Sequence, residues 1–230
     1  MSHDSWTHLL ARRAIRPLLG TGVTPNHLTT MRLLTGVAAC AAIGAGTREG
    51  AWWGGGLWLL SAFLDRADGE LARVGNMMSA AGHRYDFYVD LGVNALFFVA
   101  AGIAVRDGWL GPWAVPLGLL GGTAMLLCGW WSELLEARSP AGTKAYSGAA
   151  GFDPDDALYL MGPVAWLGWL APVVLGAAVG ATAMMAITGI RLRRLAVRPG
   201  PATHTLAPGL ESRTPDLAQL EVGGHGRFSK

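Results

Sequence analysis

The sequence predicts an all-α polytopic membrane protein with six transmembrane helices and an N-terminal amphipathic helix on the cytoplasmic side. Of its 230 residues, 51% are hydrophobic and another 33 are glycine, whereas these groups together make up about 45–50% of a soluble domain. Only 15% of the residues are charged, against about 25% in soluble domains. The apolar residues also gather in segments close to the roughly 20 residues that a transmembrane helix requires.

The composition also excludes other classes of protein. Most of the chain is too apolar to be disordered, because disordered segments are polar and rich in charge. The net charge of +2 gives no reason to expect a nucleic-acid partner. The two cysteines, Cys40 and Cys128, cannot build a disulfide framework and fall inside predicted spans, where they act as small packing residues.

Residues 1–22 are predicted to form an amphipathic juxtamembrane helix. Basic and apolar side chains are mixed between Ser5 and Leu19, without the continuous apolar stretch of a secretory signal. Such a helix suits the surface of a membrane, with its apolar face buried at the headgroup boundary.

Residues 23–195 are predicted to form the six-helix transmembrane domain. Four apolar segments are evident, at residues 28–46, 51–74, 82–105 and 113–131. The stretch 157–192 is too long for one span, so we divide it into two short spans. We place the break near residues 168–172, because glycine and proline interrupt helices there.

The distribution of basic residues predicts the orientation of this domain. With six spans, both termini lie on the side that collects most arginines, and the opposite side holds only Arg48 and Arg106. This bias puts both termini in the cytoplasm. The abundance of arginine, alanine and glycine suggests a bacterial inner membrane. Residues 196–230 are polar, without periodicity, and are expected to form a disordered cytoplasmic tail.

Four aspartates lie inside the second and third predicted spans, where carboxylates are costly and usually functional. Asp65 and Asp68 are three residues apart, and Asp86 and Asp90 are four apart, so each pair shares one helix face. A short connection makes the two spans antiparallel and brings the four acids to one level in the cytoplasmic third of the membrane. Such a group of oxygen ligands suits two Mg²⁺ or Mn²⁺ ions. A proton or cation pathway, or pairing with neighbouring arginines, is the alternative.

The segment from Asp65 to Asp90 resembles the signature of the CDP-alcohol phosphotransferase family, D-x2-D-G-x2-A-R-x8-G-x3-D-x3-D. All eight fixed positions are filled, by Asp65, Asp68, Gly69, Ala72, Arg73, Gly82, Asp86 and Asp90. A looser likeness lies upstream, where Thr24, Pro25 and Asn26 are followed by Thr29 and Arg32.

The resemblance implies a reaction. Members of this family displace CMP from a CDP-linked alcohol, often CDP-diacylglycerol, by the hydroxyl of a second alcohol. They require Mg²⁺ or Mn²⁺, have six transmembrane helices and commonly form homodimers. The expected partners are therefore a CDP-alcohol lipid donor, a small or lipid alcohol acceptor, membrane lipid and a second copy of the chain.

The resemblance also implies roles for the four acids. Asp65, Asp68 and Asp86 would hold the metal ions that grip the pyrophosphate. Asp90 would complete this metal site and act as the general base that takes the proton of the acceptor hydroxyl.

The expected CDP contacts are small or polar residues of the motif and of the upstream segment. They are Gly69, Ala72, Arg73, Gly82, Asn26 and Thr29. The small residues could instead serve close helix packing, and Arg73 could be a topology anchor. For the upstream residues, the alternative is that Thr24 or Asn26 caps the first helix and that the segment anchors it at the membrane interface. Glu70, at a variable position, either supports the site or faces the loop.

The acceptor is not defined by the sequence. Arg138 and Lys144, in the predicted cytoplasmic loop 132–156, would suit a phosphorylated acceptor, but they also fit the general bias of basic residues to the cytoplasm. A cation-coupled transporter would need a second acid cluster in the last three spans, which the sequence lacks. An inactive scaffold is disfavoured by the complete set of acids.

Overall fold

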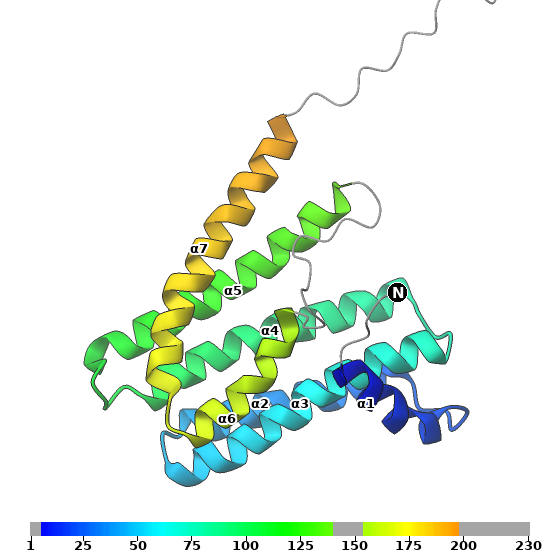
Figure 1. The fold of residues 1–230 in the computed structure, drawn as a ribbon, viewed down its shortest axis with the longest axis horizontal. Coiled ribbons are helices and arrows are strands. Elements are labelled where there is room, and N and C mark those ends of the chain that lie inside the picture. The colour runs from blue at the N-terminus through cyan, green and yellow to red at the C-terminus, as the bar shows by residue number, and fades with distance from the viewer. Residues whose placement is uncertain (1–5, 140–153, 198–230) are drawn as a thin grey trace, which may run out of the picture. The chain divides into compact units, whose positions relative to one another are not determined.

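The structure, a computed structural model, describes residues 6–139 and 154–197 (Figure 1). All elements in these two ranges are α-helices or short 3-10 helices, which confirms the all-α prediction. The α-helices are α1 (Trp6–Ile15), α2 (Pro25–Gly44), α3 (Arg48–Val74), α4 (Ala80–Ala104), α5 (Ala114–Ala137), α6 (Met161–Trp166) and α7 (Leu170–Val197). The 3-10 helices are η1 (Arg16–Leu18), η2 (Gly111–Trp113) and η3 (Pro154–Leu160).

Local sequence signals set the ends of the two helices that carry the aspartates. The backbone N–H of Gly50 donates to the side chain of Thr47 at 3.0 Å, which caps α3. Gly82 donates in the same way to Ser79 at 3.0 Å and caps α4. Hydroxyl residues at this position satisfy N–H groups that the first turn leaves unpaired. Between the helices Asn76 adopts a positive φ of 52°, which asparagine tolerates better than most residues.

Helix α2 packs along both α3 and α4, so it supports the two aspartate-bearing helices from one side. At Gly36 of α2, an added Cβ would lie 2.5 Å from Val93 of α4 and 2.9 Å from Ser61 of α3. Glycine is therefore required for α2 to approach both helices this closely.

The main hydrophobic core joins all the helices from α2 to α7. Trp58 of α3 and Phe97 of α4 lie at its centre, with ring centroids 4.4 Å apart. The indole N–H of Trp58 also donates to the carbonyl of Leu158 at 2.8 Å, which attaches η3 to this core. A buried indole generally finds such a partner.

Three helices are long and apolar enough to cross a membrane, and they match the third, fourth and sixth predicted spans. They cover Ala80–Ala104, Gly111–Ala137 and Leu170–Leu195. Helices α2 and α3 have 20 and 27 residues, but α3 carries the charged residues of the motif in its last turns. The six-span arrangement therefore stays a prediction for α2, α3 and the fifth span.

The fifth predicted span is short in the structure, where it consists of η3 and α6. The break that follows lies where it was predicted, since α6 ends at Trp166 and α7 begins at Leu170. Gly168, between them, has a positive φ of 72°, a conformation that glycine adopts without steric cost.

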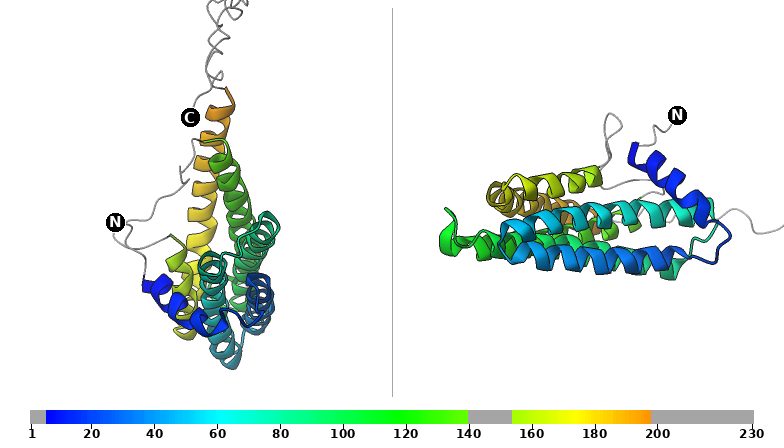
Figure 2. Two further views of the ribbon diagram at one scale, coloured as in Figure 1. Left: turned by 90° about the vertical axis from the view of Figure 1, so that its right-hand side faces the viewer. Right: turned by 90° about the horizontal axis from the view of Figure 1, so that it is seen from below.

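Helix α1 lies beside α3 (Figure 1, Figure 2). Ile15 is buried with Ala67 and Leu71 in a second hydrophobic cluster, whereas Leu9 and Leu10 are exposed. The predicted N-terminal helix is thus present over ten residues of the 1–22 segment. Its attachment to a membrane surface stays a prediction, and the predicted tail from residue 198 onward lies outside the described residues.

Candidate active site

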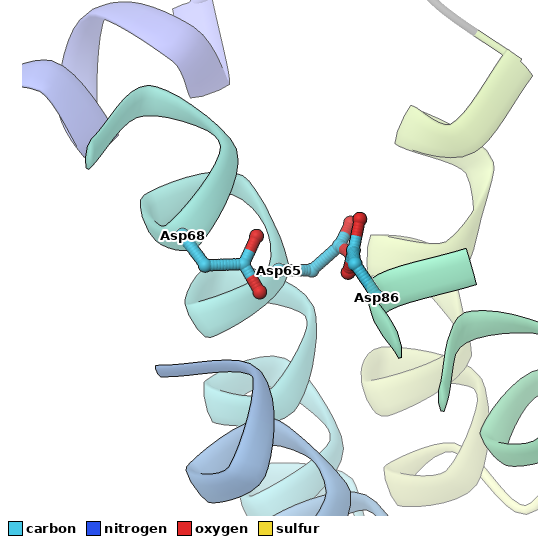
Figure 3. Close-up of side chains that lie close together, drawn as sticks. All are labelled: Asp65, Asp68 and Asp86. Atoms are coloured by element: carbon cyan, nitrogen blue, oxygen red, sulfur yellow. The ribbon is translucent and has the colours of Figure 1, made fainter. Parts of the chain in front are cut away.

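The motif aspartates of α3 and α4 face one another. Oxygen atoms of Asp65, Asp68 and Asp86 all lie within 4.8 Å of one another, and Figure 3 shows their carboxylates meeting between the two helices. The residue spacing on each helix and the packing of both helices on α2 together produce this cluster. Asp90 lies one turn farther along α4 and is outside the group of three.

The aspartate triad, Asp65, Asp68 and Asp86, fits a divalent cation. Its donors are all carboxylate oxygens, the ligand type that Mg²⁺ and Mn²⁺ prefer. Asp68 is 3% exposed, whereas the side chains of Asp65 and Asp86 are 26% and 37% exposed. The triad is therefore open on one side, where phosphate oxygens could share a bound cation.

Arg32 of α2 occupies the space between the two pairs of acids. One guanidinium nitrogen, Nη1, lies 2.5 Å from Asp65 and 3.5 Å from Asp86, and Nη2 lies 2.5 Å from Asp90. The Arg32 side chain is only 3% exposed. A buried guanidinium requires ion pairs of this kind, so Arg32 offsets part of the negative charge of the cluster.

Arg32 belongs to the upstream segment of the motif, but these ion pairs were not predicted from the sequence. The sequence feature that could have indicated them is the single charge of Arg32 inside a predicted apolar span, since such a charge requires a buried partner. Asn94, one turn after Asp90, was also missed, and its amide donates to Asp90 Oδ1 at 2.7 Å.

Thr29 contacts the triad directly. Its hydroxyl lies 2.7 Å from Asp68 Oδ2 and 3.2 Å from the carbonyl of Pro25, and the residue is 2% exposed. Since a hydroxyl has one proton, the shorter contact identifies Asp68 as the acceptor. Thr29 thereby orients one of the triad carboxylates.

All six predicted CDP contacts line one pocket of about 510 Å³ next to the triad. They are Asn26, Thr29, Gly69, Ala72, Arg73 and Gly82, and Asp68 and Asp86 line the same pocket. A second pocket of about 230 Å³ contains the three triad residues and Asp90. The two pockets adjoin, because they share Asp68, Gly69, Arg73, His83 and Asp86. Together they are called the aspartate cleft below.

The glycines of the motif face this cleft and not the backbone of a neighbouring helix. A Cβ at Gly69 would meet only the guanidinium of Arg73, at 3.5 Å. A Cβ at Gly82 would lie 2.9 Å from the hydroxyl of Ser79 and 3.2 Å from the side-chain oxygen of Asn26. These contacts favour the substrate-contact interpretation of the small residues over helix packing.

Arg73 is held by Glu70, which precedes it by one turn. Its Nη2 lies 2.7 Å from Glu70 Oε1, and about half of the Arg73 side chain remains exposed. Glu70 is buried, at 1% exposed, and also accepts hydrogen bonds from His8 and Arg12 of α1. Of the two alternatives for Glu70, the structure therefore favours a supporting role over a position facing the loop.

The predicted acceptor contacts are not brought to the aspartate cleft by the described residues. Arg138 is exposed at the C-terminal cap of α5 and lines neither pocket. Lys144 lies outside the described residues.

Residues 22–185 match the family described as CDP-alcohol phosphatidyltransferase, and the chain belongs to this family. The match covers the motif, all four aspartates, helices α2 to α6 and the first part of α7, but not α1. The comparison with curated proteins gives no match. The family transfers a phospho-alcohol group from a CDP-alcohol to an acceptor, acts in phospholipid biosynthesis at the membrane, and is generally dependent on a divalent metal.

Proposed function

We propose that this protein transfers a phosphatidyl group from CDP-diacylglycerol to the hydroxyl of an acceptor alcohol and releases CMP. The observation that supports this most directly is that the two adjoining pockets of the aspartate cleft share residues of the acid triad. One end carries the predicted nucleotide contacts, the other carries Asp90, and the acid triad lies between them. A CDP-alcohol bound along the cleft has its diphosphate beside the triad and its alcohol moiety toward Asp90.

A lipid-linked donor is supported by the surroundings of the cleft. Asp90 lies ten residues after the start of α4, which is about 15 Å along a helix at about 1.5 Å per residue. A further pocket of about 150 Å³, lined by Phe87, Tyr88 and Trp130 among others, shares His83 and Phe87 with the aspartate cleft. These aromatic side chains give an apolar surface on which an acyl chain can lie.

We assign the divalent cations, Mg²⁺ or Mn²⁺ and two in number, to Asp65, Asp68 and Asp86, with Asp90 as the adjoining fourth acid. When bound, such ions neutralise phosphate oxygens and stabilise the departing CMP. Thr29 fixes the direction of the Asp68 carboxylate through its hydrogen bond. Arg73 donates to a phosphate of CDP from its exposed guanidinium.

Asp90 is proposed as the general base. Both Arg32 Nη2 and the Asn94 amide donate to the same oxygen, Oδ1. The carboxylate is thereby oriented, and Oδ2 would accept the proton of the acceptor hydroxyl. The side chain is 40% exposed, so an acceptor can reach it from the cleft. A positioned base contributes about 10²–10⁴-fold to a rate of this kind.

The oligomeric state and the cellular location are part of the same proposal. We propose a homodimer in a bacterial inner membrane, with both termini and the cleft in the cytoplasm. Gly176 and Gly180 on α7 have no other described atom within 4 Å of a built Cβ, so a helix of a second copy can approach there closely. For the acceptor, Arg138 and Lys144 remain candidates for binding a phosphate.

The test is release of CMP from CDP-diacylglycerol by the purified protein with Mg²⁺. Serine, glycerol 3-phosphate, inositol and inositol phosphate are supplied in turn as acceptors. We expect CMP and a new phospholipid with one of them, and neither product when Asp68 is changed to Asn. A protein that folds but releases no CMP with any acceptor contradicts the proposed donor.

A further inference from the structure

Glu70 is the most deeply buried acid in the part of the chain that the structure describes, at 1% exposed. Its carboxylate accepts hydrogen bonds from Arg73 Nη2 at 2.7 Å, His8 Nδ1 at 2.9 Å and Arg12 Nε at 3.0 Å. A buried carboxylate is tolerated when its oxygens are satisfied by charged donors in this way. Two of these donors come from α1, more than fifty residues away in the sequence.

Apolar contacts hold α1 in the same place. Ile15 is 1% exposed and packs with Ala67 and Leu71 of α3, on the turns that flank Glu70. Ala11, one turn earlier on α1, is fully buried. The position of α1 on α3 is therefore defined by both packing and ion pairs.

His8 lies in the wall of the aspartate cleft, where it lines the pocket that contains the acid triad. Since Nδ1–H donates to Glu70, the neutral imidazole has its acceptor at Nε2. Arg66 Nη1 is 3.4 Å from Nε2, and Arg73 Nη2 is 3.4 Å from Nδ1. His8 is thus placed between two arginines that line the same pocket.

We propose that α1 completes the active site, with Glu70 and His8 acting as positioning residues for Arg66 and Arg73. The two arginines then form a positively charged side of the cleft opposite the acid triad. The diphosphate of the donor binds between these arginines and the triad. Guanidinium groups held in a fixed direction bind phosphate oxygens more tightly than mobile ones, because less side-chain entropy is lost on binding. This inference rests on the proposed function for the identity of the donor.

A matched pair of variants on α1 tests the inference in the full-length protein. His8→Ala and Arg12→Ala each remove one α1 partner of Glu70, but only His8 lies in the cleft. The measurements are the Kd of CDP with Mg²⁺ present, and KM and kcat for CDP-diacylglycerol. We expect His8→Ala to raise the Kd and KM about tenfold and to change kcat less than about threefold, as loss of an oriented phosphate contact predicts.

Arg12→Ala is expected to lower the melting temperature and to raise the Kd of CDP much less than His8→Ala does, since Arg12 supports the docking of α1 but does not line the cleft. Equal effects of the two variants on the Kd, or no effect of His8→Ala, would overturn the inference and leave α1 as a structural support. Glu70→Gln keeps the shape of the side chain and is expected to raise the Kd as His8→Ala does. If Glu70→Gln does not fold, the comparison of His8→Ala with Arg12→Ala alone tests the inference.

The measurement with CDP separates this inference from the proposed function. A wild type that binds CDP but releases no CMP from CDP-diacylglycerol contradicts the proposed donor, while the comparison of His8→Ala with Arg12→Ala still tests the role of α1. A wild type active on CDP-diacylglycerol whose His8→Ala variant binds CDP normally contradicts the inference alone.

Discussion

The guanidinium of Arg32 on α2 lies 2.5 Å from a carboxylate oxygen of Asp90 on α4, although 58 positions separate the two residues in the chain. The backbone carbonyl of Arg32 also accepts a hydrogen bond from the Ser61 hydroxyl of α3 at 3.0 Å. Arg32 therefore connects the three helices that build the aspartate cleft. Because the guanidinium is buried, its replacement should affect both folding and catalysis.

Two substitutions at Arg32 separate these effects. Arg32→Gln leaves three carboxylates without their shared cation and should destabilise the protein by about 3–5 kcal/mol, the usual cost of breaking a buried pair. Arg32→Lys keeps the charge, but a single ammonium cannot replace the two nitrogens that contact Asp65 and Asp90 separately. We expect Arg32→Lys to fold and to lose at least about tenfold in kcat.

Thermal unfolding in detergent and the rate of CMP release are the measurements for both variants. Arg48→Gln, at the exposed start of α3, is the matched control and should leave both unchanged. Full activity of Arg32→Lys would mean that catalysis requires only the positive charge of Arg32 and not its two separate contacts.

Asp90→Asn tests the general base. The amide keeps the size of the side chain and removes its basicity, so kcat should fall by about 10²–10⁴-fold. CDP binding in the presence of Mg²⁺ should stay close to the wild-type value, because the acid triad is intact. Loss of CDP binding together with turnover would instead mean that Asp90 acts mainly as a metal ligand and not as the general base.

Asn94→Leu tests the orientation of that base. The Asn94 amide donates to Asp90 Oδ1 at 2.7 Å and is 5% exposed, so leucine removes the hydrogen bond at a buried site of similar volume. We expect kcat to fall by about tenfold, because misplacing a catalytic group is costly even when the group remains. The KM for the donor should be unchanged. A rise in KM alone would show that Asn94 supports the donor site and not the base.

The parts of the site that could be predicted from the sequence are those in which spacing along one helix decides the geometry. Asp65 and Asp68 share a face because they are one helical turn apart, and the same holds for Asp86 and Asp90. Gly69 and Ala72 line the aspartate cleft for the same reason, since they lie on the turns of α3 next to Asp68.

The ion pairs of Arg32 and Glu70 could not be predicted, since they depend on how helices pack. Arg32 contacts Asp90 because α2 lies against both α3 and α4, and no local pattern encodes that packing. His8 reaches Glu70 across 62 positions for a similar reason. Helix α3, predicted as a span, is not among the helices apolar enough to cross a membrane, and it carries charged residues at both ends.

Removal of divalent metal should abolish activity, and added Mg²⁺ or Mn²⁺ should restore it.

The structural test of this prediction is Thr29→Val, which removes the hydrogen bond to Asp68 without changing the triad itself. The freed carboxylate is less well oriented, so the Mg²⁺ concentration for half-maximal activity should rise several-fold, less than the roughly 10–100-fold upper range for a support of a metal ligand. Thr35→Val, on the same helix but away from the triad, is the control. An unchanged Mg²⁺ requirement in Thr29→Val would place the cation elsewhere.

The contact between α4 and α5 depends on two facing glycines, which gives a stability prediction independent of the chemistry. A Cβ at Gly102 would lie 2.7 Å from the carbonyl oxygen of Ala114 and 3.0 Å from the Cα of Gly118. Backbone atoms cannot yield as a flexible side chain can, so Gly102→Ala must separate the two helices. We expect a loss of about 1–3 kcal/mol, the range for an overpacked core.

Gly92→Ala on the same helix is the matched control. No other described atom lies within 4 Å of a Cβ built at Gly92, and alanine in a helix is favoured over glycine by about 0.5–1 kcal/mol. Thermal unfolding in detergent should therefore move in opposite directions for the two variants, down for Gly102→Ala and unchanged or up for Gly92→Ala. Equal melting temperatures would mean that α4 and α5 are not held at this distance in the folded protein. Gly102 lies twelve residues after Asp90, and Gly92 lies on the other side of α4 from Asp90, since two residues span about 200° of a helix. CMP release per folded molecule should therefore remain that of the wild type in each case.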